Sequence, residues 1–490
     1  MKKDLLIFLN RKCLKIFCLG FSSGLPILLV FSTLSVWLVK AGIERSTVTL
    51  FSWAGFAYAF KYLWSPVVDN FELPLFSRLG HRRGWLLFSQ LLITFFIIVV
   101  AFTDPNENII YTAISISFLA FFSATQDISV DAFRIESAPK NMQGPLSSMY
   151  IAGYRISMIV SGAGSLWLAS YLGGEKYDLL VWRNVYLIMS TLMTIGVLTV
   201  ICSNEPSIRK NKNLKINNHI NFIIFVFISI LIFGTIYNYL DNPFQKNQVF
   251  LSFLFSTIRI VICFTGIILL FYFSSFFKVI NKKTISRSFI EPINNFITKY
   301  GRFAVLILTL IAFYRIADVV MGVMANIFYL EKGYTVSDIA TYSKFFGLIA
   351  TIIGGFLGGY FAFKIGTMKA LFIGAVIAAL SNILFAWLAS VNTEIKYLIS
   401  VIIADNISSG FAGAAFVVYI SNLTSVKFTA TQYALFSSIM LFFPKLIAGY
   451  AGSWVDVMGY QNFFLITALL GVPVIFLISY LNYKLPMKNK

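Results

Sequence analysis

The chain has 490 residues, a mean hydropathy of +0.81 and only 12% charged residues, so most of its surface cannot face water. Apolar runs of about 20 residues recur along its whole length, and a helix of that length crosses the roughly 30 Å hydrocarbon core of a bilayer. These features exclude a soluble globular protein. They also exclude a closed β-barrel, whose strands are shorter and alternate in polarity. The composition therefore predicts an all-α polytopic membrane protein.

The formal net charge of +19 does not indicate a nucleic-acid partner. Basic residues gather in the cytoplasmic loops of polytopic proteins, and no Lys/Arg-rich domain stands apart from the apolar segments. The four cysteines lie in or beside apolar runs without metal-ligand spacing, and the two histidines lie in loop-like contexts. We therefore expect no nucleic acid, no metal, no cofactor and no catalytic cluster.

The apolar segments divide the chain into about fourteen transmembrane helices. The first segment is too long for the apolar core of a signal peptide, so we expect it to be a membrane helix. The segments are 14–39, 47–68, 85–103, 109–133, 145–172, 181–203, 220–239, 249–277, 303–330, 338–362, 370–391, 397–422, 430–454 and 461–482.

Loop charge supports this number of helices. With both termini in the cytoplasm, the inner segments hold about 26 Lys and Arg residues and the outer loops about 7. Adding or removing one helix would move every later loop to the other side and would spoil the asymmetry. We therefore predict a multi-pass protein of a bacterial inner membrane with both termini in the cytoplasm.

Two stretches of the chain, 38–48 and 329–339, resemble each other. Each closes a long helix, turns at Gly42 or Gly333, and restarts at a serine that can cap the next helix. Two six-helix halves in parallel repeat are the architecture of the major facilitator superfamily, with substrate bound between the halves. The predicted parts are a six-helix half over 1–203, basic linkers with an inserted two-helix hairpin over 204–302, and a second six-helix half over 303–490.

The segment Gly80–Gly84, which follows Asp69, resembles the cytoplasmic loop motif of the major facilitator superfamily. In that motif, an aspartate at the end of the second helix and basic loop residues latch the inner gate. Charge pairs and helix-end dipoles at the inner rim can favour one access state. An ordinary basic loop is the alternative. We assign gating to Asp69, Arg82, Arg83 and Asp131.

Asp127 and Asp131 are four residues apart, so they share one face of an apolar helix. Two buried carboxylates this close disfavour each other's ionised form, and one of them could take up and release a proton. Asp127 lies deeper and is the proton or substrate site. We expect Asp131 and Glu136 to pair with Arg82 or Arg83 at the interface.

Lys61 lies well inside the second predicted helix, and Arg155 lies inside the fifth, so neither side chain reaches the membrane surface easily. One alternative is an internal ion pair with Asp127. The other is an anion-binding face for a carboxylate-bearing substrate, for which the planar fork of arginine is suited.

The second half carries buried charges of its own. Arg315 and Asp318 are three residues apart and can neutralise each other, yet a buried ion pair is often no better than apolar packing of the same volume. Their presence therefore indicates a wet cavity, and we assign Asp318, with Asp127, to proton coupling. The other charged residues in these segments are Lys344, Asp405 and Lys445.

Five stretches of the chain resemble the AmpG family of bacterial muropeptide permeases. They are Gly-Phe-Ser-Ser-Gly-Leu-Pro at 20–26, Lys-Tyr-Leu-Trp-Ser-Pro-Val-Val-Asp at 61–69, Arg-Arg-Gly-Trp at 82–85, Thr-Gln-Asp-Ile-Ser-Val-Asp-Ala-Phe-Arg at 125–134, and Thr-Ala-Thr-Gln-Tyr at 429–433. The resemblance implies proton-driven import of N-acetylglucosaminyl-anhydro-N-acetylmuramic acid, with or without its stem peptide. The anionic glycopeptide would meet Lys61, Gln126, Tyr154, Arg155, Arg315 and Lys445.

Two other functions are open to this sequence. The same fold can carry another anionic metabolite, such as an acetyl-CoA-like molecule, or can export drugs. A membrane-embedded transferase would need acid–base groups on a loop, and the outer loops are short and poor in them. We therefore predict a monomeric transporter, not an enzyme, whose partners are its cargo, protons and the bilayer.

Overall fold

The computed structural model describes residues 6–43, 51–173, 177–206, 286–334, 338–448 and 451–484, together with scattered residues between 228 and 270. Every regular element in these ranges is helical, which confirms the predicted all-α class. Nine of the described helices are long and apolar enough to cross a membrane. Most of the predicted hairpin, 220–239 and 249–277, lies outside the described residues.

The first half of the chain forms one bundle. Glycines let α2 and α9 pack closely, because a Cβ at Gly20 would meet the backbone of Tyr150, and a Cβ at Gly153 would meet the carbonyl of Phe17. The helices of this bundle are α2 (Arg11–Val30), α3 (Ser32–Lys40), α5 (Phe56–Ala59), α6 (Ser65–Asn70), α7 (His81–Ala101), α8 (Ile109–Glu136), α9 (Gln143–Ile159), α10 (Ser165–Tyr171), α11 (Leu179–Leu192) and α12 (Thr194–Ile201).

The second half forms another bundle, in which Gly354, Gly358 and Gly410 allow equally close packing of α20 and α22. Its helices are α16 (Glu291–Tyr300), α17 (Ala304–Phe313), α18 (Ile316–Glu331), α20 (Gly347–Ile365), α21 (Thr367–Ser390), α22 (Ile395–Leu423), α23 (Thr429–Ala448) and α24 (Ala451–Lys484). The helix α24 contains a kink at Gly459.

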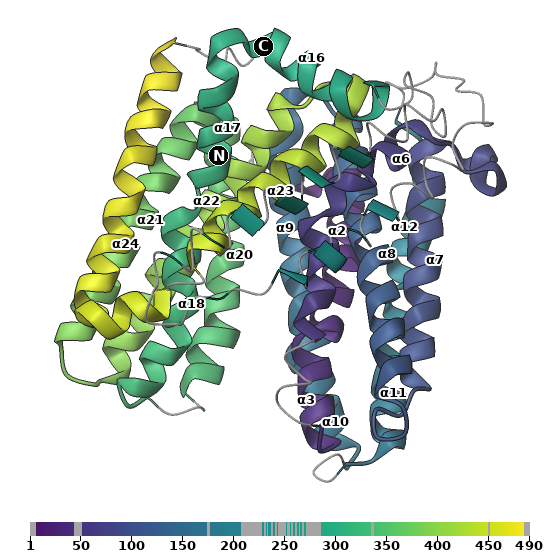
Figure 1. Ribbon diagram of the computed structural model, residues 1–490, viewed down its shortest axis with the longest axis horizontal. Coiled ribbons are helices and arrows are strands. Elements are labelled where there is room, and N and C mark those ends of the chain that lie inside the picture. The colour runs from purple at the N-terminus through teal and green to yellow at the C-terminus, as the bar shows by residue number, and fades with distance from the viewer. Residues whose placement is uncertain are drawn as a thin grey trace.

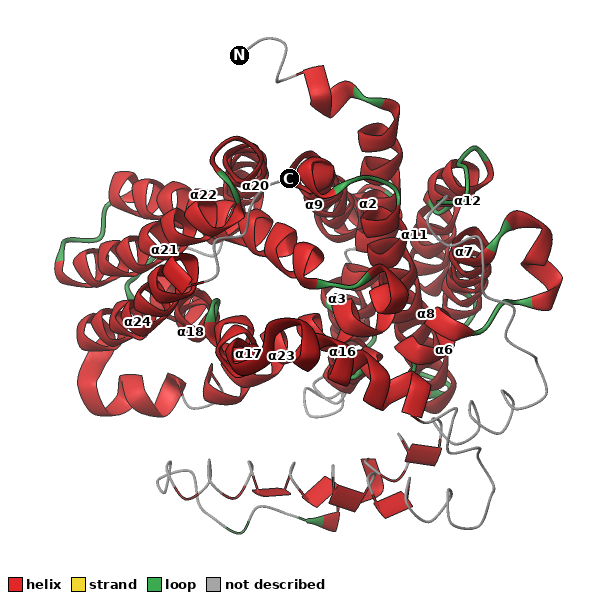
Figure 2. Cartoon of the chain, turned by 90° about the horizontal axis from the view of Figure 1, so that it is seen from above, coloured by secondary structure: helices red, strands yellow, loops and turns green. Residues whose placement is uncertain are grey.

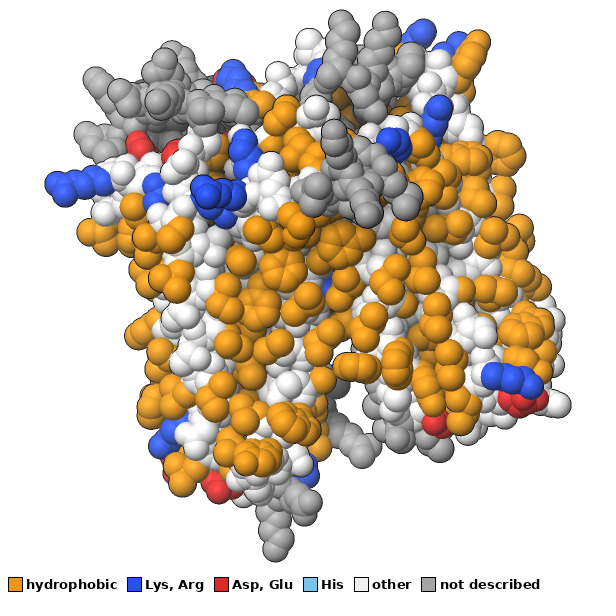
Figure 3. Space-filling view, turned by 180° about the vertical axis from the view of Figure 1, so that it is seen from behind, with side chains coloured by type: hydrophobic (Ala, Val, Ile, Leu, Met, Phe, Trp, Pro, Cys, Tyr) orange, Lys and Arg blue, Asp and Glu red, His pale blue; other side chains and the backbone are white. Residues whose placement is uncertain are grey.

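The two bundles lie side by side, and each has its own main hydrophobic core, although Ile135 of α8 packs into the core of the second half (Figure 1, Figure 2). They meet at the upper end of Figure 1, where Val68 and Trp64 of the first half and Ala430 and Ala434 of the second half share a small apolar cluster. Figure 3 shows a notch between them at the lower edge, and a broad apolar band across this face of the molecule, below most of its Lys and Arg side chains. This band is the surface that a bilayer requires.

Corresponding turns in the two halves use the same backbone conformation. Gly42 and Gly333 have φ of 77° and 99°, and Gly80 and Gly366 have φ of 98° and 93°, which are values that side-chain-bearing residues rarely adopt. These paired turns therefore match in backbone conformation as well as in sequence position. The boundaries at 203 and 302 stay a prediction.

Several predicted spans are interrupted. In the segment expected at 47–68, the described residues from Phe51 onward form α5, the start of α6 and short 3₁₀ turns, one of which holds Lys61. Five residues in π-helical geometry, Val160–Gly164, separate α9 from α10. A further break after Tyr314 separates α17 from α18 and places Arg315 between them. Such interruptions are tolerated where neighbouring helices or polar groups satisfy the freed backbone.

Candidate functional site

At the upper end of Figure 1, the two halves are joined by a hydrogen-bonded network that we call the latch, formed by Asp69, Arg82, Glu136, Glu205 and Thr431. The Arg82 guanidinium lies 2.7 Å from Asp69 Oδ1 and 2.7 Å from Glu136 Oε1, and all three side chains are fully buried. Its Nε also donates to Glu136 Oε2 at 3.0 Å. The bidentate pair fixes the planar guanidinium between α6 and α8.

Asp69 connects this ion pair to the other half of the chain. Its Oδ2 accepts hydrogen bonds from the Thr431 backbone N at 2.7 Å and from Thr431 Oγ1 at 2.8 Å, and its Oδ1 accepts one from the Ala430 N at 3.3 Å. These groups form the N-terminal turn of α23, where a carboxylate is favoured by the free N–H groups and the helix dipole. The carboxylate therefore holds α23 against α6.

Glu205 holds the N-terminus of α7 in the same way. It accepts hydrogen bonds from the backbone N–H groups of Arg82 at 2.8 Å and Arg83 at 3.1 Å. Burial raises the pKa of Glu205 above its ordinary value of 4.5, although the two backbone N–H groups act in the opposite direction. The Arg83 side chain donates to the carbonyls of Val200 and Ile201 at the C-terminal end of α12.

The expected partner of Arg82 was Asp131 or Glu136, and the structure selects Glu136. Asp131 lies five residues earlier on α8, which is about 7.5 Å along the helix axis, so it is too deep to reach Arg82. Asp131 instead contacts Lys61, at 3.9 Å from Nζ, and Arg134, at 3.4 Å from Nη2. The ion pair expected between Lys61 and Asp127 is therefore formed with Asp131.

Backbone packing also joins the halves near the latch. A Cβ added to Gly144 of α9 would lie 2.6 Å from the carbonyl oxygen of Gly359 on α20, and a Cβ at Gly359 would collide with Ser148 Oγ. Ser148 Oγ donates to the Gly355 carbonyl at 3.0 Å. These contacts require glycine, so this end of the molecule closes only when the two helices touch.

Arg134 bridges the halves from inside. Its Nη1 donates to Ser147 at 2.9 Å and, across the interface, to Ser421 of α22 at 3.1 Å. The guanidinium also lies over the rings of Tyr150 and Tyr433, at 5.8 and 5.4 Å from their centroids. Arg134 therefore connects the charged cluster of the first half to the closed interface.

Asp127 lies one helical turn deeper than Asp131, and Lys61 and Asp131 are its charged neighbours. Its Oδ1 is buried and has no hydrogen-bond partner among the described residues. The neighbouring Gln126 is fully buried and donates to Ser22 at 2.9 Å, which ties α8 to α2. Tyr154 is half-buried and lies within electrostatic range of Asp127.

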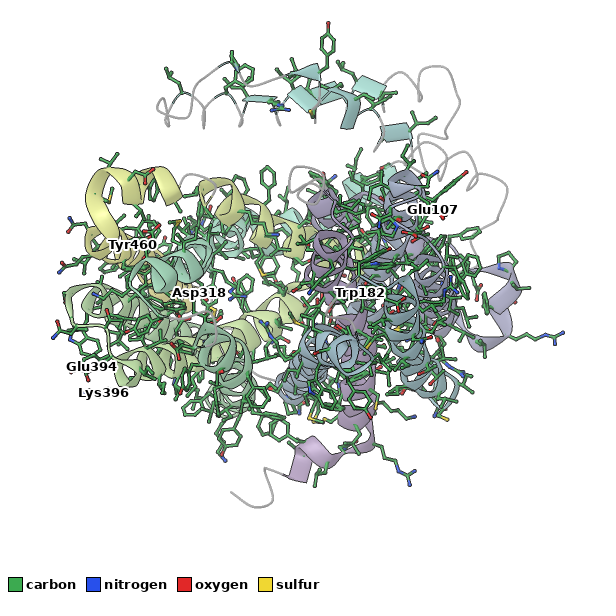
Figure 4. All side chains as sticks on the ribbon, turned by 90° about the horizontal axis from the view of Figure 1, so that it is seen from below. Glu107, Trp182, Asp318, Glu394, Lys396 and Tyr460 are labelled. Carbon is green, nitrogen blue, oxygen red and sulfur yellow. The ribbon has the colours of Figure 1, made fainter. Side chains whose placement is uncertain are left out.

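The second half contains a cavity of about 210 Å³, which we call the pocket. Arg315 Nη2 lies 3.1 Å from Asp318 Oδ2 and 3.0 Å from Ser409 Oγ, and Asp405 accepts a hydrogen bond from Ser381 at 3.3 Å. Figure 4 shows Asp318 inside this bundle, away from Glu394, Lys396 and Tyr460 at its edge. The pocket is lined by Arg315, Asp318, Val319, Met321, Gly322, Ala325, Tyr329, Ser343, Asp405 and Ser409.

The predicted basic contacts to cargo do not lie in one place. Arg155 and Arg315, from opposite halves, are close enough to repel each other, and Arg155 makes no ion pair with a carboxylate of the described residues. Lys61 is buried in the cluster around Asp131, and Lys445 is exposed on α23. The side chain of Lys344 lies outside the described part of the chain.

Sequence reasoning did not connect Arg134 or Thr431 to the interface between the halves, or Glu205 to the N-terminus of α7. Thr431 lies in the first turn of a helix that begins at Thr429, and the first turn of a helix is where carboxylates bind. This position was the one feature of the sequence that could have indicated the contact of Thr431 with a carboxylate. Nothing in the local sequence pairs Glu205 with a helix 120 residues earlier. Among the described residues, no group of three or more His, Cys, Asp or Glu side chains could hold a metal ion.

Two bundles of apolar helices with buried charges between them define a multi-pass membrane transporter. The Major Facilitator Superfamily matches residues 16–449, and the chain is 32% identical over 478 residues to an AmpG 4 protein of Rickettsia felis, covering 98% of each chain. The chain therefore belongs to the AmpG family of the Major Facilitator Superfamily.

More distant comparisons agree with this class. The anhydromuropeptide permease of Escherichia coli K12 is 27% identical over 474 residues, covering 96% of this chain and 80% of that protein. Among solved structures, the proton:xylose symporter XylE has a TM-score of 0.60 at 11% identity, covering 98% of this chain and 95% of that one. FucP in its outward conformation has the same TM-score at 12% identity, covering 95% and 97%. These likenesses confirm the fold, and the family is one of transporters, not enzymes.

Proposed function

We propose that this protein imports anhydromuropeptides across a bacterial inner membrane, coupled to protons, by alternating access between its two halves. The chemistry of the cargo is supported by the relative from Escherichia coli, which is named an anhydromuropeptide permease. The distribution of Lys and Arg supports cytoplasmic termini, and in this orientation the latch lies at the cytoplasmic end. With the latch closed, cargo enters from the opposite end.

The observation that carries this proposal is a set of charged groups in both halves with buried atoms that have no hydrogen-bond partner among the described residues. Asp127 Oδ1 and Asp318 Oδ1 are buried carboxylate atoms with no hydrogen-bond partner among the described residues, and each suits reversible protonation. Arg155 and Arg315 offer positive charge to the carboxylates of a muropeptide. Lys61 and Lys445 are further candidate contacts, and Gln126 and Tyr154 flank Asp127.

Transport then follows from the geometry of the latch. Opening at the cytoplasmic end requires Asp69 to leave the N-terminus of α23, and α9 to leave α20. Arg134 contacts both Asp131 and Ser421, so the charge of the cluster that contains Asp127 is linked directly to the interface. A proton on this cluster changes the balance between the closed and open arrangements, as a two-state equilibrium requires.

Uptake of labelled anhydromuropeptide into cells that lack their own importer tests the proposal. We expect accumulation that a protonophore abolishes. Absence of uptake, with the protein present in the membrane, would refute this cargo and would direct the search to other anionic metabolites. Uptake unaffected by the protonophore would refute the coupling alone.

The role of Asp127 has a separate test. Asp127→Asn should abolish proton-driven accumulation while it preserves counterflow exchange, because exchange needs cargo binding and no net proton movement. Glu107→Gln, which removes an exposed carboxylate outside the bundles' interior, is the matched control and should leave both activities unchanged. Equal loss of both activities in Asp127→Asn would show that this residue has a structural role.

A further inference from the structure

The described side chains that line the pocket in the second half include two carboxylates and one cation. The cation is Arg315, and the carboxylates of Asp318 and Asp405 lie within electrostatic range of each other. Asp405 receives one hydrogen bond, from Ser381 Oγ at 3.3 Å. A carboxylate inside a membrane protein is costly without a compensating charge, which favours a proton or a bound cation in this pocket.

Unused polar atoms indicate where a ligand would bind. Asp318 Oδ1 and Arg315 Nε are buried without hydrogen-bond partners among the described residues, and the Asp318 side chain is only 9% exposed. Ser343 and Ser409 add hydroxyl groups to the same wall. A cavity of about 210 Å³ has room for a small polar group of several heavy atoms.

The opposite half contributes a complementary charge. Arg155 projects from α9 and lies close enough to Arg315 for the two guanidinium groups to repel each other. Within the described part of the chain, Arg155 forms no ion pair, and its one recorded side-chain contact is with the sulfur of Met158 at 3.8 Å. A carboxylate near the two arginines would offset their repulsion, and a guanidinium can bind a carboxylate through two parallel hydrogen bonds.

We propose that Arg155 and the pocket together form a binding site for a zwitterionic, amino-acid-like group, with its ammonium at Asp318 and Asp405 and its carboxylate at Arg155 and Arg315. Two cationic and two anionic side chains then match one anionic and one cationic ligand group, so the complex has no net charge. We identify the molecule that carries this zwitterionic group as the peptide portion of an anhydromuropeptide, and this identification rests on the proposed function. The expected charge pattern of the ligand does not depend on the proposed function.

The test compares two forms of one cargo, an anhydromuropeptide whose peptide carries a free ammonium and the same molecule with that ammonium acetylated. Binding to the purified full-length protein and uptake by cells are both measured. We expect the wild-type protein to bind the ammonium form about tenfold more tightly, which is the effect of roughly 1.4 kcal/mol. Asp405→Asn should remove this preference by weakening the ammonium form alone, and the acetylated form should bind as before.

Glu394→Gln is the matched control, because Glu394 is an exposed carboxylate that pairs with Lys396 at 2.6 Å. It should preserve the preference. Equal affinity of the wild-type protein for the two forms would overturn the inference, as would a preference that survives Asp405→Asn. The wild-type comparison needs no variant, so poor folding of Asp405→Asn does not prevent a decision. Preferential binding without any uptake would refute the proposed function and leave the zwitterion site in place.

Discussion

At the latch, Arg82 contacts two carboxylates at 2.7 Å, and Asp69 uses both of its oxygens on the Arg82 guanidinium and the N-terminus of α23. In the pocket, Arg315 contacts one carboxylate, and buried atoms of Arg315 and Asp318 are unused among the described residues. Both regions place charge inside a membrane protein. The fully paired charges of the latch stabilise one arrangement of the two halves. The incompletely paired charges of the pocket are available to a ligand or a proton.

Removing the central cation of the latch should have the largest effect. Arg82→Ala leaves the buried Asp69 and Glu136 without their cation, and breaking a buried ion pair in this way costs about 3–5 kcal/mol. We expect a large fall in thermal stability and loss of the closed latch, measured by unfolding of the purified protein and by labelling of cysteines introduced at the interface. Arg78→Ala, an exposed basic residue of the same loop, is the control. Equal stability of the two variants would contradict the paired-charge interpretation.

A methyl group added where α9 contacts α20 should disturb the packing at the latch end of the molecule without changing any charge. Gly359→Ala places a Cβ against Ser148 Oγ and the Gly144 carbonyl, and overpacking of this kind costs about 1–3 kcal/mol. Because only the closed arrangement brings these groups together, we expect transport to slow about tenfold with little loss of protein from the membrane. Gly413→Ala, which has open space around its Cβ, should transport normally. A normal rate in Gly359→Ala would show that the latched arrangement is not part of the cycle.

Neutralising Arg155 should weaken the binding of cargo and should leave the stability of the folded protein nearly unchanged. Arg155→Gln removes a guanidinium that forms no ion pair with a described carboxylate, so we expect KM to rise about tenfold with little change in kcat. Amidating the cargo carboxylates should raise the wild-type KM similarly and should leave the variant unaffected. Arg302→Gln, an exposed position, serves as the control. Additive effects of the variant and the amidated cargo would argue against a direct contact.

The smallest expected effect concerns pH at the latch. Burial raises the pKa of Glu205 in the folded protein above its ordinary value of 4.5. The Glu205 carboxyl therefore binds its proton more tightly in the folded protein than in the unfolded chain. Stability from this group is therefore present at low pH and is lost as pH rises through the raised pKa. Glu205→Gln should flatten the dependence of thermal stability on pH above about 4.5. An unchanged slope would mean that Glu205 does not titrate differently in the folded protein.

Much of the architecture was predictable because it depends on local properties of the chain. Helix length and hydropathy identified the membrane segments, and glycines at turns such as Gly42 and Gly333 revealed the repeat. The motif around Asp69 and Arg82 predicted an interaction that the structure shows at 2.7 Å. The breaks around Lys61 and Arg315 were not predictable, since apolar composition continues across them and only packing against neighbouring helices determines where a helix stops.

The sequence alone was enough to predict that this chain spans a membrane in two related halves and that a few charged residues lie inside the helix bundles. An apolar run or an ionisable residue within it can be recognised without knowing what it contacts. Only the tertiary structure decided which charges meet. Asp69 binds Thr431 across 362 residues, Lys61 pairs with Asp131 rather than Asp127, and Arg155 lies within electrostatic range of Arg315 from the other half. The physical reason is that an ion pair depends on distance in space, which is set by how the helices pack and not by their order in the chain.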